Sequence, residues 1–259
     1  SSACGKSGID ILTEAKVVGL FADKTGYVHG LSIERSDGAI EKIGTNAVIF
    51  ATCGFGANSN WINKYMPEIS NALYYGHDGN RGDGIGWGKE LGADTRDMGS
   101  YQALGSLAYP QMLVIPHTLL ISGGLQVNNN GERFQNELDD ISGQTLNILK
   151  QPEGTCWIVY DEKAHQDALR FEEYLSAVNL GVPKKADTPA ALASKMKVPS
   201  ENLVKTFHSS SNYYNGLNIA TNITTISITV GISLYILKNF ELFWLLSVAK
   251  SLKYFPRVK

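Results

Sequence analysis

Glycine is concentrated in the middle of the chain. Residues 51–131 hold 14 of the 26 glycines, and four of these fall at alternate positions from 82 to 88. Because glycine has no Cβ, such a run is typical of backbone that lies very close to another group. The triplet Gly82-Asp83-Gly84 leads directly into the helix-like segment 85–91, whose free N-terminal amides suit an anion. We interpret the region as a ligand-binding loop, with a set of plain turns as the alternative.

Strand patterns precede the glycine-rich region. Alternating segments joined by the tight turns Asp23-Lys24-Thr25-Gly26 and Ser36-Asp37-Gly38 predict an antiparallel meander that extends to residue 43. The continuous apolar run 47–51 is typical instead of a strand buried on both faces of a parallel sheet. The strands predicted before it are 9–12, 15–21 and 27–34. We therefore expect an α/β fold for the first part of the chain.

The pattern changes after Tyr101. Short strands, predicted at 125–128 and 156–160, alternate with helices. One helix begins at Thr188-Pro189, an N-cap followed by a first-turn proline, and another begins at Ser200. This pattern predicts a second, smaller α+β unit, and we expect the two units to meet near residues 98–110.

Charge and cysteine content exclude several classes of function. The chain has 23 Lys and Arg against 25 Asp and Glu, so it lacks the basic excess that neutralises phosphate backbones, and we expect no nucleic-acid partner. The three cysteines lie far apart and form no CxxC pair, which is typical of reduced thiols in a cytoplasmic protein. His and carboxylate residues do not cluster at metal-ligand spacing, so we expect no metal site.

The two ends of the sequence differ from the rest. The chain opens at Ser1 without an initiator Met or a secretory signal, which we interpret as an entry into the middle of a larger protein. Residues 206–237 contain no Asp, Glu, Lys or Arg. One membrane helix is conceivable there, but repeated Asn, Thr and Ser residues dilute the apolar stretch. We therefore interpret 211–259 as an atypical apolar tail, foreign to the fold, with membrane attachment through it as the alternative.

Three motifs occur in a fixed order. They are the segment 46–58 (NAVIFATCGFGAN), the triplet Gly82-Asp83-Gly84, and the segment 123–137, which contains GGLQVN and GERFQNE. Together they closely resemble the FAD-binding fumarate reductase and succinate dehydrogenase flavoproteins and their 3-ketosteroid dehydrogenase relatives. The resemblance covers about residues 8–207, and three ordered motifs are far more specific than any one glycine pattern.

The resemblance implies an α/β plus α+β architecture. Residues 1–100 would be the later part of a Rossmann-like FAD-binding domain, and 101–210 would be a smaller capping domain that closes over the flavin. The family's glycine-rich pyrophosphate loop and its closing FAD segment have no counterpart in this sequence. We therefore expect a central fragment that binds FAD weakly or not at all by itself.

The resemblance also implies cofactor contacts. Thr52 and Gly54 match the strand-end turn that approaches the flavin, Asp83 matches an Asp that touches FAD, and Val17 matches a residue whose backbone contacts adenine. Ala51, at the end of the same strand, completes the predicted cofactor-binding set. Cys53 stands where the family usually has a second Gly, so a Cβ and a thiol occupy a position of close contact.

Residues of the second unit match the substrate side of the family's site. His117, just before Gly123-Gly124, could orient a carboxylate or carbonyl, and Arg133 matches the Arg-Phe-x-Asn-Glu segment whose charged network braces the site. A surface or core histidine and a plain surface ion pair are the respective alternatives. Ile141 stands where the fumarate reductase branch has an Arg that acts as general acid, which leaves Tyr109 or His117 as the candidate proton donor. The predicted catalytic set is therefore His117, Tyr109 and Arg133.

Other polar residues receive plain interpretations. We expect His165 and His208 to be solvated, and the pair Asp139-Asp140 to be a solvated loop rather than an acid/base pair.

The resemblance implies an FAD-dependent oxidoreductase that moves a hydride between flavin and an activated CH–CH or C=C bond beside a carbonyl or carboxylate. The substrate would be a small molecule, either a dicarboxylate or a steroid-like compound, and the electron partner stays open. Two alternatives remain, namely a non-catalytic fragment of an FAD site and a membrane-attached protein anchored by its tail.

Overall fold

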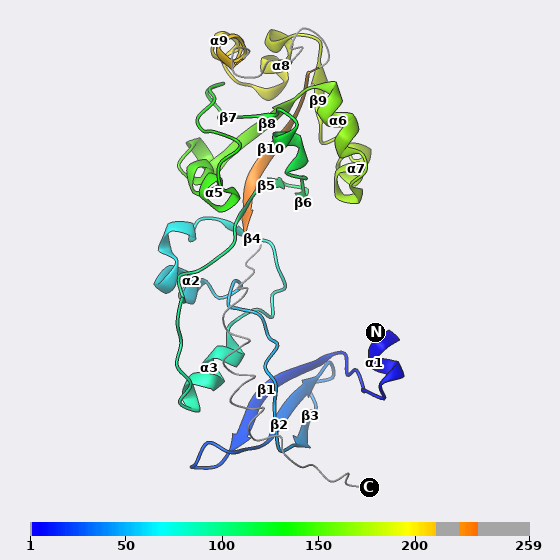
Figure 1. Ribbon diagram of the computed structural model, residues 1–259, viewed down its shortest axis with the longest axis vertical. Helices are drawn as coiled ribbons and strands as arrows, with labels where there is room; N and C mark the ends of the chain where they lie inside the picture. Colours follow the sequence, from blue (N-terminus) through cyan, green and yellow to red (C-terminus); the bar gives the residue numbers. More distant parts are fainter. Residues whose placement is uncertain (1, 211–222, 233–259) are drawn as a thin grey trace. The chain divides into compact units, whose positions relative to one another are not determined.

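The computed structural model describes residues 2–210 and 223–232 (Figure 1). These residues form two compact units. Unit 1 contains the described residues up to Cys53 together with Gly82–Arg96, and unit 2 contains Gly54–Arg81 and the described residues from Asp97 onward. The chain thus leaves unit 1 after Cys53 and returns to it at Gly82.

Unit 1 is built on a three-stranded antiparallel meander. Its strands β1 (Ala15–Ala22), β2 (Val28–Arg35) and β3 (Ile40–Gly44) pair in that order, with a register shift between Val17 and Gly19. The two glycines of the predicted turns, Gly26 and Gly38, have positive φ angles of 84° and 82°, as tight turns require. The meander prediction is therefore confirmed. The other elements of unit 1 are the helices α1 (Ser2–Lys6) and α3 (Asp83–Glu90).

The apolar run 47–51 is not a strand, so this prediction is wrong. None of its residues has strand structure, and the side chain of Ile49 is 73% exposed. A strand buried on both faces needs neighbours on both edges. In the described part of unit 1, the only strands are those of the meander, and they pair with one another. The predicted strand 9–12 is likewise absent.

Unit 2 contains a seven-stranded mixed sheet. Its main path has the order β6-β5-β10-β8-β7, and β4 and β9 also pair with β10. The only parallel pairing is that of β4 with β10. The strands are β4 (Leu73–Tyr74), β5 (Leu104–Ala108), β6 (Leu113–Val114), β7 (Leu125–Val127), β8 (Thr155–Tyr160), β9 (Lys184–Ala186) and β10 (Ile223–Ile232).

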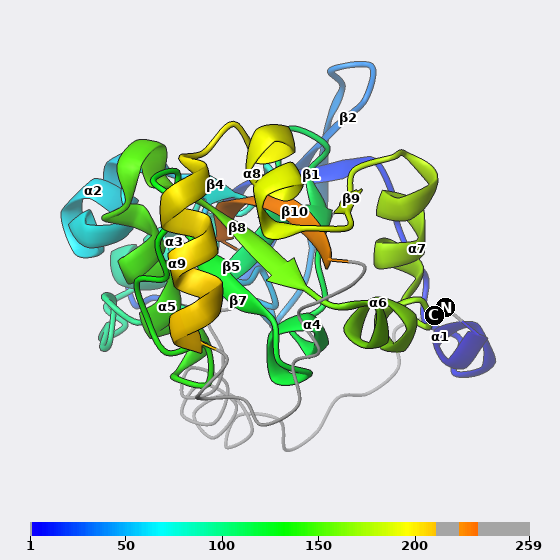
Figure 2. The same ribbon diagram turned by 90° about the horizontal axis from the view of Figure 1, so that it is seen from above.

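Helices pack on this sheet. The helices α8 (Pro189–Met196) and α9 (Ser200–Ser210) form a buried apolar cluster with β7 and β8, through Leu192, Leu203, Trp157 and Val159 (Figure 2). Thr188 caps α8 by accepting from the Ala191 N–H, as the sequence predicts. The remaining helices of unit 2 are α2 (Ser59–Tyr65), α4 (Thr118–Ile121), α5 (Ile141–Leu149), α6 (Glu162–Ala168) and α7 (Glu172–Asn179), with 3₁₀ turns at Pro67–Ile69 and Pro152–Gly154.

The structure differs from the expectation of a foreign tail at one segment. Residues 223–232 form β10, which pairs antiparallel with both β5 and β8 and therefore lies inside the sheet. Its sequence, ITTISITVGI, is rich in the β-branched residues that favour strands. The remainder of the predicted tail, 211–222 and 233–259, lies outside the described residues. No helix among the described residues is long and apolar enough to cross a membrane.

Candidate functional site

The non-strand residues Thr52 and Cys53, called the Thr52 turn below, lie against the start of α3 in unit 1. A Cβ placed on Gly84 would overlap the hydroxyl oxygen of Thr52, so glycine is required for this approach. Gly82, the N-cap of α3, has a φ of 87°, which is open to glycine and strained for other residues. Asp83 is the first residue of the helix and is exposed. Two of the predicted cofactor-binding residues, Thr52 and Asp83, thus come from distant parts of the sequence to one place.

Cys53 departs from the conformation that its residue type favours. It is exposed and has a φ of 55°, in the left-handed region where a Cβ is unfavourable. The next residue, Gly54, is buried. The backbone at Cys53 therefore has the shape that a glycine would adopt freely.

The other two predicted cofactor contacts lie on the same unit. Val17 is half-buried in β1 and pairs with Ile33 of β2. Because the meander order is β1-β2-β3, the second edge of β1 has no strand partner among the described residues. Ala51 is exposed in the non-strand segment before the turn. The edge of β1 and the Thr52 turn are thus the two surfaces of unit 1 that carry predicted contacts.

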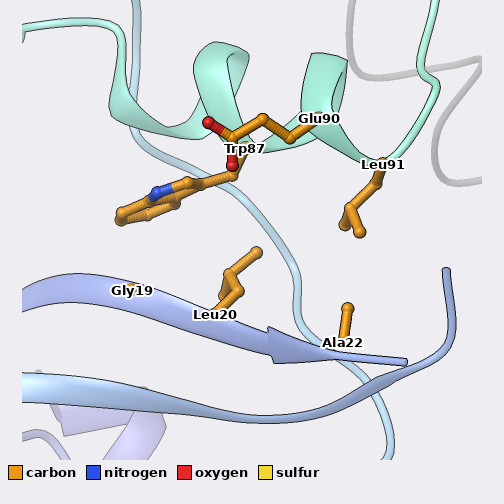
Figure 3. Close-up of a pocket in the computed structure, with 6 residues that line it drawn as sticks. All are labelled: Gly19, Leu20, Ala22, Trp87, Glu90 and Leu91. Carbon is orange, nitrogen blue, oxygen red and sulfur yellow. The ribbon is translucent and has the colours of Figure 1, made fainter. Parts of the chain in front are cut away.

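A shallow pocket of about 280 Å³ lies between β1 and α3 (Figure 3). Sequence reasoning did not identify it. The indole of Trp87 lies between the helix and the strand, and its ring centroid is 6.0 Å from that of Phe50. A tryptophan in a helix otherwise rich in glycine is the signal that could have indicated this packing. The lining residues are Gly19, Leu20, Ala22, Trp87, Glu90 and Leu91.

A buried ion pair organises the Arg-Phe-x-Asn-Glu segment in unit 2. Arg133 Nε lies 3.0 Å from both carboxylate oxygens of Glu137, and Nη2 donates to Oε2 at 2.6 Å. The Glu137 side chain is 0% exposed and that of Arg133 is 21% exposed. The backbone N–H of Gln126, in β7, also donates to Glu137 at 2.9 Å. The pair is therefore a buried brace between this segment and the sheet, and a plain surface ion pair is excluded.

Two glycines that precede this segment, Gly124 and Gly131, have structural roles. A Cβ on Gly124 would lie 2.5 Å from the carbonyl oxygen of Leu119, at the close approach of α4 to β7. A Cβ on Gly131 would lie 3.0 Å from the backbone nitrogen of Leu203 in α9, and the Thr206 hydroxyl donates to the Gly131 carbonyl. For these two glycines the packing of helices on the sheet explains the residue type without a ligand.

His117 and Tyr109 lie on the segment that surrounds β6. His117 is half-buried at the N-cap position of α4, and burial lowers the pKa of its imidazole, which favours the neutral form. Tyr109 follows β5 in the turn before β6 and is 52% exposed. Ile115 N–H donates to the Ser106 carbonyl at 2.8 Å and joins the two ends of this segment.

The residues near the start of α5 hold no acid/base pair. The carboxylate of Asp140 accepts from the Gly143 N–H at 2.7 Å and caps α5, while Asp139 accepts from the side chain of Asn136. Ile141 is the first residue of α5 and is half-buried. Among the described residues, no group of three or more His, Cys, Asp or Glu side chains could hold a metal ion.

The solvent exposure of one histidine differs from the prediction. We expected His165 to be solvated, and this expectation is wrong. The imidazole is half-buried, and its Nδ1 lies 2.6 Å from the hydroxyl of Tyr174. The polar sequence around it could not reveal a partner nine residues away on the next helix. His208 is exposed on α9.

Comparison with known proteins places these features in a family. A family model described as "FAD binding domain" matches residues 2–233. The chain is 29% identical over 191 residues to an NADH:fumarate oxidoreductase of Klebsiella pneumoniae (strain 342), covering 74% of this chain and 20% of that protein. It is also 29% identical over 214 residues to a probable fumarate reductase of Shewanella frigidimarina (strain NCIMB 400), covering 83% of this chain and 35% of the relative. The chain therefore spans about a third or less of the length of these relatives.

Solved structures share the fold. The open conformation of a flavocytochrome c3 fumarate reductase aligns with a TM-score of 0.73 at 24% identity, covering 90% of this chain and 43% of that one. A 3-ketosteroid-Δ4-(5α)-dehydrogenase from Rhodococcus jostii RHA1 aligns with a TM-score of 0.58 at 21% identity, covering 90% and 50%. The mixed α/β architecture is thus that of fumarate reductase-like FAD-binding proteins.

Proposed function

This chain belongs to the FAD-binding domain family, and from that membership we propose that it forms part of a flavoprotein oxidoreductase. The reaction would transfer a hydride at a CH–CH or C=C bond next to a carbonyl or carboxylate. The substrate would be a small dicarboxylate such as fumarate, or a steroid-like ketone. This proposal is supported by the names of the relatives, which are reductases of fumarate and dehydrogenases of 3-ketosteroids.

Thr52 and Asp83 of unit 1, together with Gly54, the second residue after Thr52, fit an FAD site. The close approach of Gly84 to Thr52 is the observation that carries the proposal, because it holds Asp83 beside the Thr52 turn at the start of α3. A carboxylate and a hydroxyl there suit the hydroxyls of the ribityl chain. We assign Thr52, Gly54 and Asp83 to this contact, with Ala51 beside them and the backbone of Val17 on the adenine.

The residues of unit 2 would act on the substrate. When bound, FAD supplies the atom that accepts or gives the hydride. Arg133, held by Glu137, would bind a substrate carboxylate or carbonyl, and the neutral imidazole of His117 would donate an N–H hydrogen bond to polarise the same group. We assign the proton of the reaction to the exposed hydroxyl of Tyr109, because Ile141 has no group that can donate one.

The domain assignment follows from the same proposal. Residues 1–100 would be the partial FAD-binding domain and 101–210 the capping domain, with 211–259 as a separate segment apart from β10. We place the protein in the cytoplasm, because Cys4, Cys53 and Cys156 are all free thiols. Cys156 is fully buried, and this raises the pKa of its thiol.

The proposal is tested with the Ile141→Arg variant. The native chain and the variant are each saturated with FAD at equal occupancy, the flavin is reduced with dithionite, and its reoxidation by fumarate or by a 3-ketosteroid is followed by absorbance against reduced FAD alone. We expect slow reoxidation by fumarate in the native chain and an increase on the order of a hundredfold in the variant, because a restored donor is worth about that factor. Fast reoxidation by the native chain without improvement by Arg would show that the family's Arg proton route has been wrongly carried over to position 141.

A non-catalytic FAD-binding fragment is the second candidate function. The residue types of Cys53 and Ile141 favour it, since both differ from those that the family resemblance implies at these positions. Flavin that binds to the chain and is not reoxidised by any substrate, in the native or the variant form, would support this candidate.

A further inference from the structure

Three polar side chains in unit 2 form a hydrogen-bonded chain away from the proposed site. Tyr160 ends β8, Tyr174 lies in α7 and His165 lies in α6. The two tyrosine hydroxyls are 2.8 Å apart, and His165 Nδ1 is 2.6 Å from the Tyr174 hydroxyl. Tyr160 is 1% and Tyr174 is 0% exposed, so neither hydroxyl has water as a substitute partner.

The hydrogens of this chain can be ordered in one satisfied way. Burial raises the pKa of Tyr174 to about 12 and raises that of Tyr160 further, so both hydroxyls keep their hydrogens. If Tyr160 donates to Tyr174 and Tyr174 donates to His165 Nδ1, each hydrogen has an acceptor. If Nδ1 carries a hydrogen instead, one buried hydroxyl has no acceptor among the described residues. Every hydrogen of the Tyr160–Tyr174–His165 hydrogen-bonded chain therefore has an acceptor only when Nδ1 of the imidazole is itself an acceptor.

The helices that this chain joins support the segment carrying Tyr109 and His117. α7 packs against β6 (Figure 1), and α6 packs against α4 (Figure 2). Tyr109 directly follows β5, in the turn that leads into β6, and His117 is the N-cap of α4. α6 and α7, which these hydrogen bonds link to the end of β8, therefore pack against the two elements that adjoin Tyr109 and His117.

We propose that the chain Tyr160–Tyr174–His165 is a positioning device that holds α6 and α7, and through them β6 and α4, only while His165 is neutral. Tyr109 and His117 would then lose their support when the imidazole gains a proton, because a protonated imidazole carries hydrogen on both nitrogens. Histidine is the side chain that ordinarily changes charge between pH 5 and 8. Any effect of this device on catalysis rests on the proposed function, whereas its effect on the packing of α6, α7, β6 and α4 does not.

The other titratable groups near His165 are unchanged in the histidine and tyrosine variants described below. Glu162 lies one turn earlier on α6 and pairs with Lys185 of β9 at 2.7 Å, which lowers the pKa of its carboxyl. α7 carries Glu172 and Glu173 in its first turn, and α4 has His117 at its N-cap. The strand β10, which also contacts α6, contains no titratable residue.

Hydrogen exchange of the full 259-residue chain tests the device. Amide protection is measured by mass spectrometry at pH 8 and pH 5 and corrected for the intrinsic rates, for the native chain, His165→Asn and His165→Leu. The Oδ1 of Asn can accept from Tyr174 and does not titrate, whereas Leu has no acceptor. In the native chain we expect protection of α4, β6, α6 and α7 to fall about tenfold or more at pH 5, since an unsatisfied buried hydroxyl costs about that factor. His165→Asn should keep its protection at both pH values and His165→Leu should lack it at both.

Two further variants keep the proposal falsifiable if a histidine variant folds poorly. Tyr174→Phe leaves the Tyr160 hydroxyl without its acceptor, whereas Tyr160→Phe removes only the terminal donor, so the first should lose more protection. Amides of α8 and α9, which pack with β7 and β8 in a separate apolar cluster, serve as the internal control and should not change. The same pH response in the native chain and in His165→Asn, or equal effects of the two tyrosine variants, would overturn the proposal. Exchange needs no flavin or turnover, so its outcome is independent of the proposed activity.

Discussion

At the scale of single residues, Cys53 carries an unusual combination of residue type and backbone. Its φ of 55° costs an ordinary residue about 1–2 kcal/mol and costs a β-branched residue more. We therefore predict that Cys53→Val destabilises the chain by at least about 1 kcal/mol, while Cys53→Gly is neutral or stabilising. Urea unfolding followed by circular dichroism measures both. Equal losses for Val and Gly would show that the side chain of Cys53, rather than its backbone, matters for stability.

The pair Arg133–Glu137 predicts a second measurable difference. Glu137→Gln keeps an acceptor for the Gln126 N–H but removes the charge that faces the partly buried guanidinium, so we expect a loss of about 3 kcal/mol in unfolding free energy. Glu41→Gln is the matched control, because Glu41 pairs with Arg35 at 3.0 Å but is 50% exposed. That change should cost less than about 1 kcal/mol. If the two substitutions cost the same, the Arg133 pair is no more important than a surface pair.

Sequence reasoning could find some of these residues and not others. Thr52 and Asp83 could be named as candidates from the sequence because their motifs place glycines beside them. Glu137 could be named because it belongs to a contiguous segment. The Tyr160–Tyr174–His165 chain could not be predicted from the sequence, because it depends on how the end of a strand and two helices are placed relative to one another. Such a contact has no local pattern in the sequence.

At the scale of secondary-structure elements, local signals worked where the partners are also local. The meander and α8 were predicted from turns and an N-cap that act within a few residues. The segment 47–51 was predicted as a strand from its apolar composition, but a strand also needs hydrogen-bonding partners from elsewhere in the chain. β10 was missed for the converse reason, because its four partner strands are distant in sequence. At the closest paired positions the separations run from 37 residues, for Ile223 with Ala186, to 158 residues, for Gly231 with Leu73.

The start of α5 provides a test at this scale. Asp140 caps the helix through the Gly143 N–H, whereas the carboxylate of the neighbouring Asp139 accepts from the Asn136 side chain. We predict that Asp140→Ala lowers the unfolding free energy by about 1 kcal/mol, the usual cost of a lost N-cap. Asp139→Ala, an equal change of charge one residue away, should lower the unfolding free energy by only about a few tenths of a kcal/mol. Thermal unfolding of the two variants decides, and a larger loss from Asp139 would contradict the capping role.

At the scale of the whole molecule, the residues that we assign to FAD would hold only part of a dinucleotide. Thr52, Gly54, Asp83 and Val17 are assigned to the ribityl and adenine ends of FAD, while the two negative charges of a pyrophosphate are ordinarily held by backbone amides of a glycine-rich turn at a helix N-terminus. The described helix that follows a glycine-rich turn is α3, and its first residue, Asp83, carries a negative charge that repels phosphate. The relatives are several times longer than the region that they share with this chain.

We therefore predict that the 259-residue chain binds FAD weakly, without a stoichiometric flavin spectrum after dialysis. Quenching of flavin fluorescence on titration with protein measures the affinity, and riboflavin and AMP, titrated separately, report on the two ends of the cofactor. Cys53→Gly should bind FAD more tightly than the native chain, because it removes a Cβ and a thiol from the turn beside Thr52, whereas Asp83→Asn should weaken the binding of riboflavin more than that of AMP. A yellow protein with one FAD per chain would refute the prediction and would mean that phosphate is held by residues other than those assigned here.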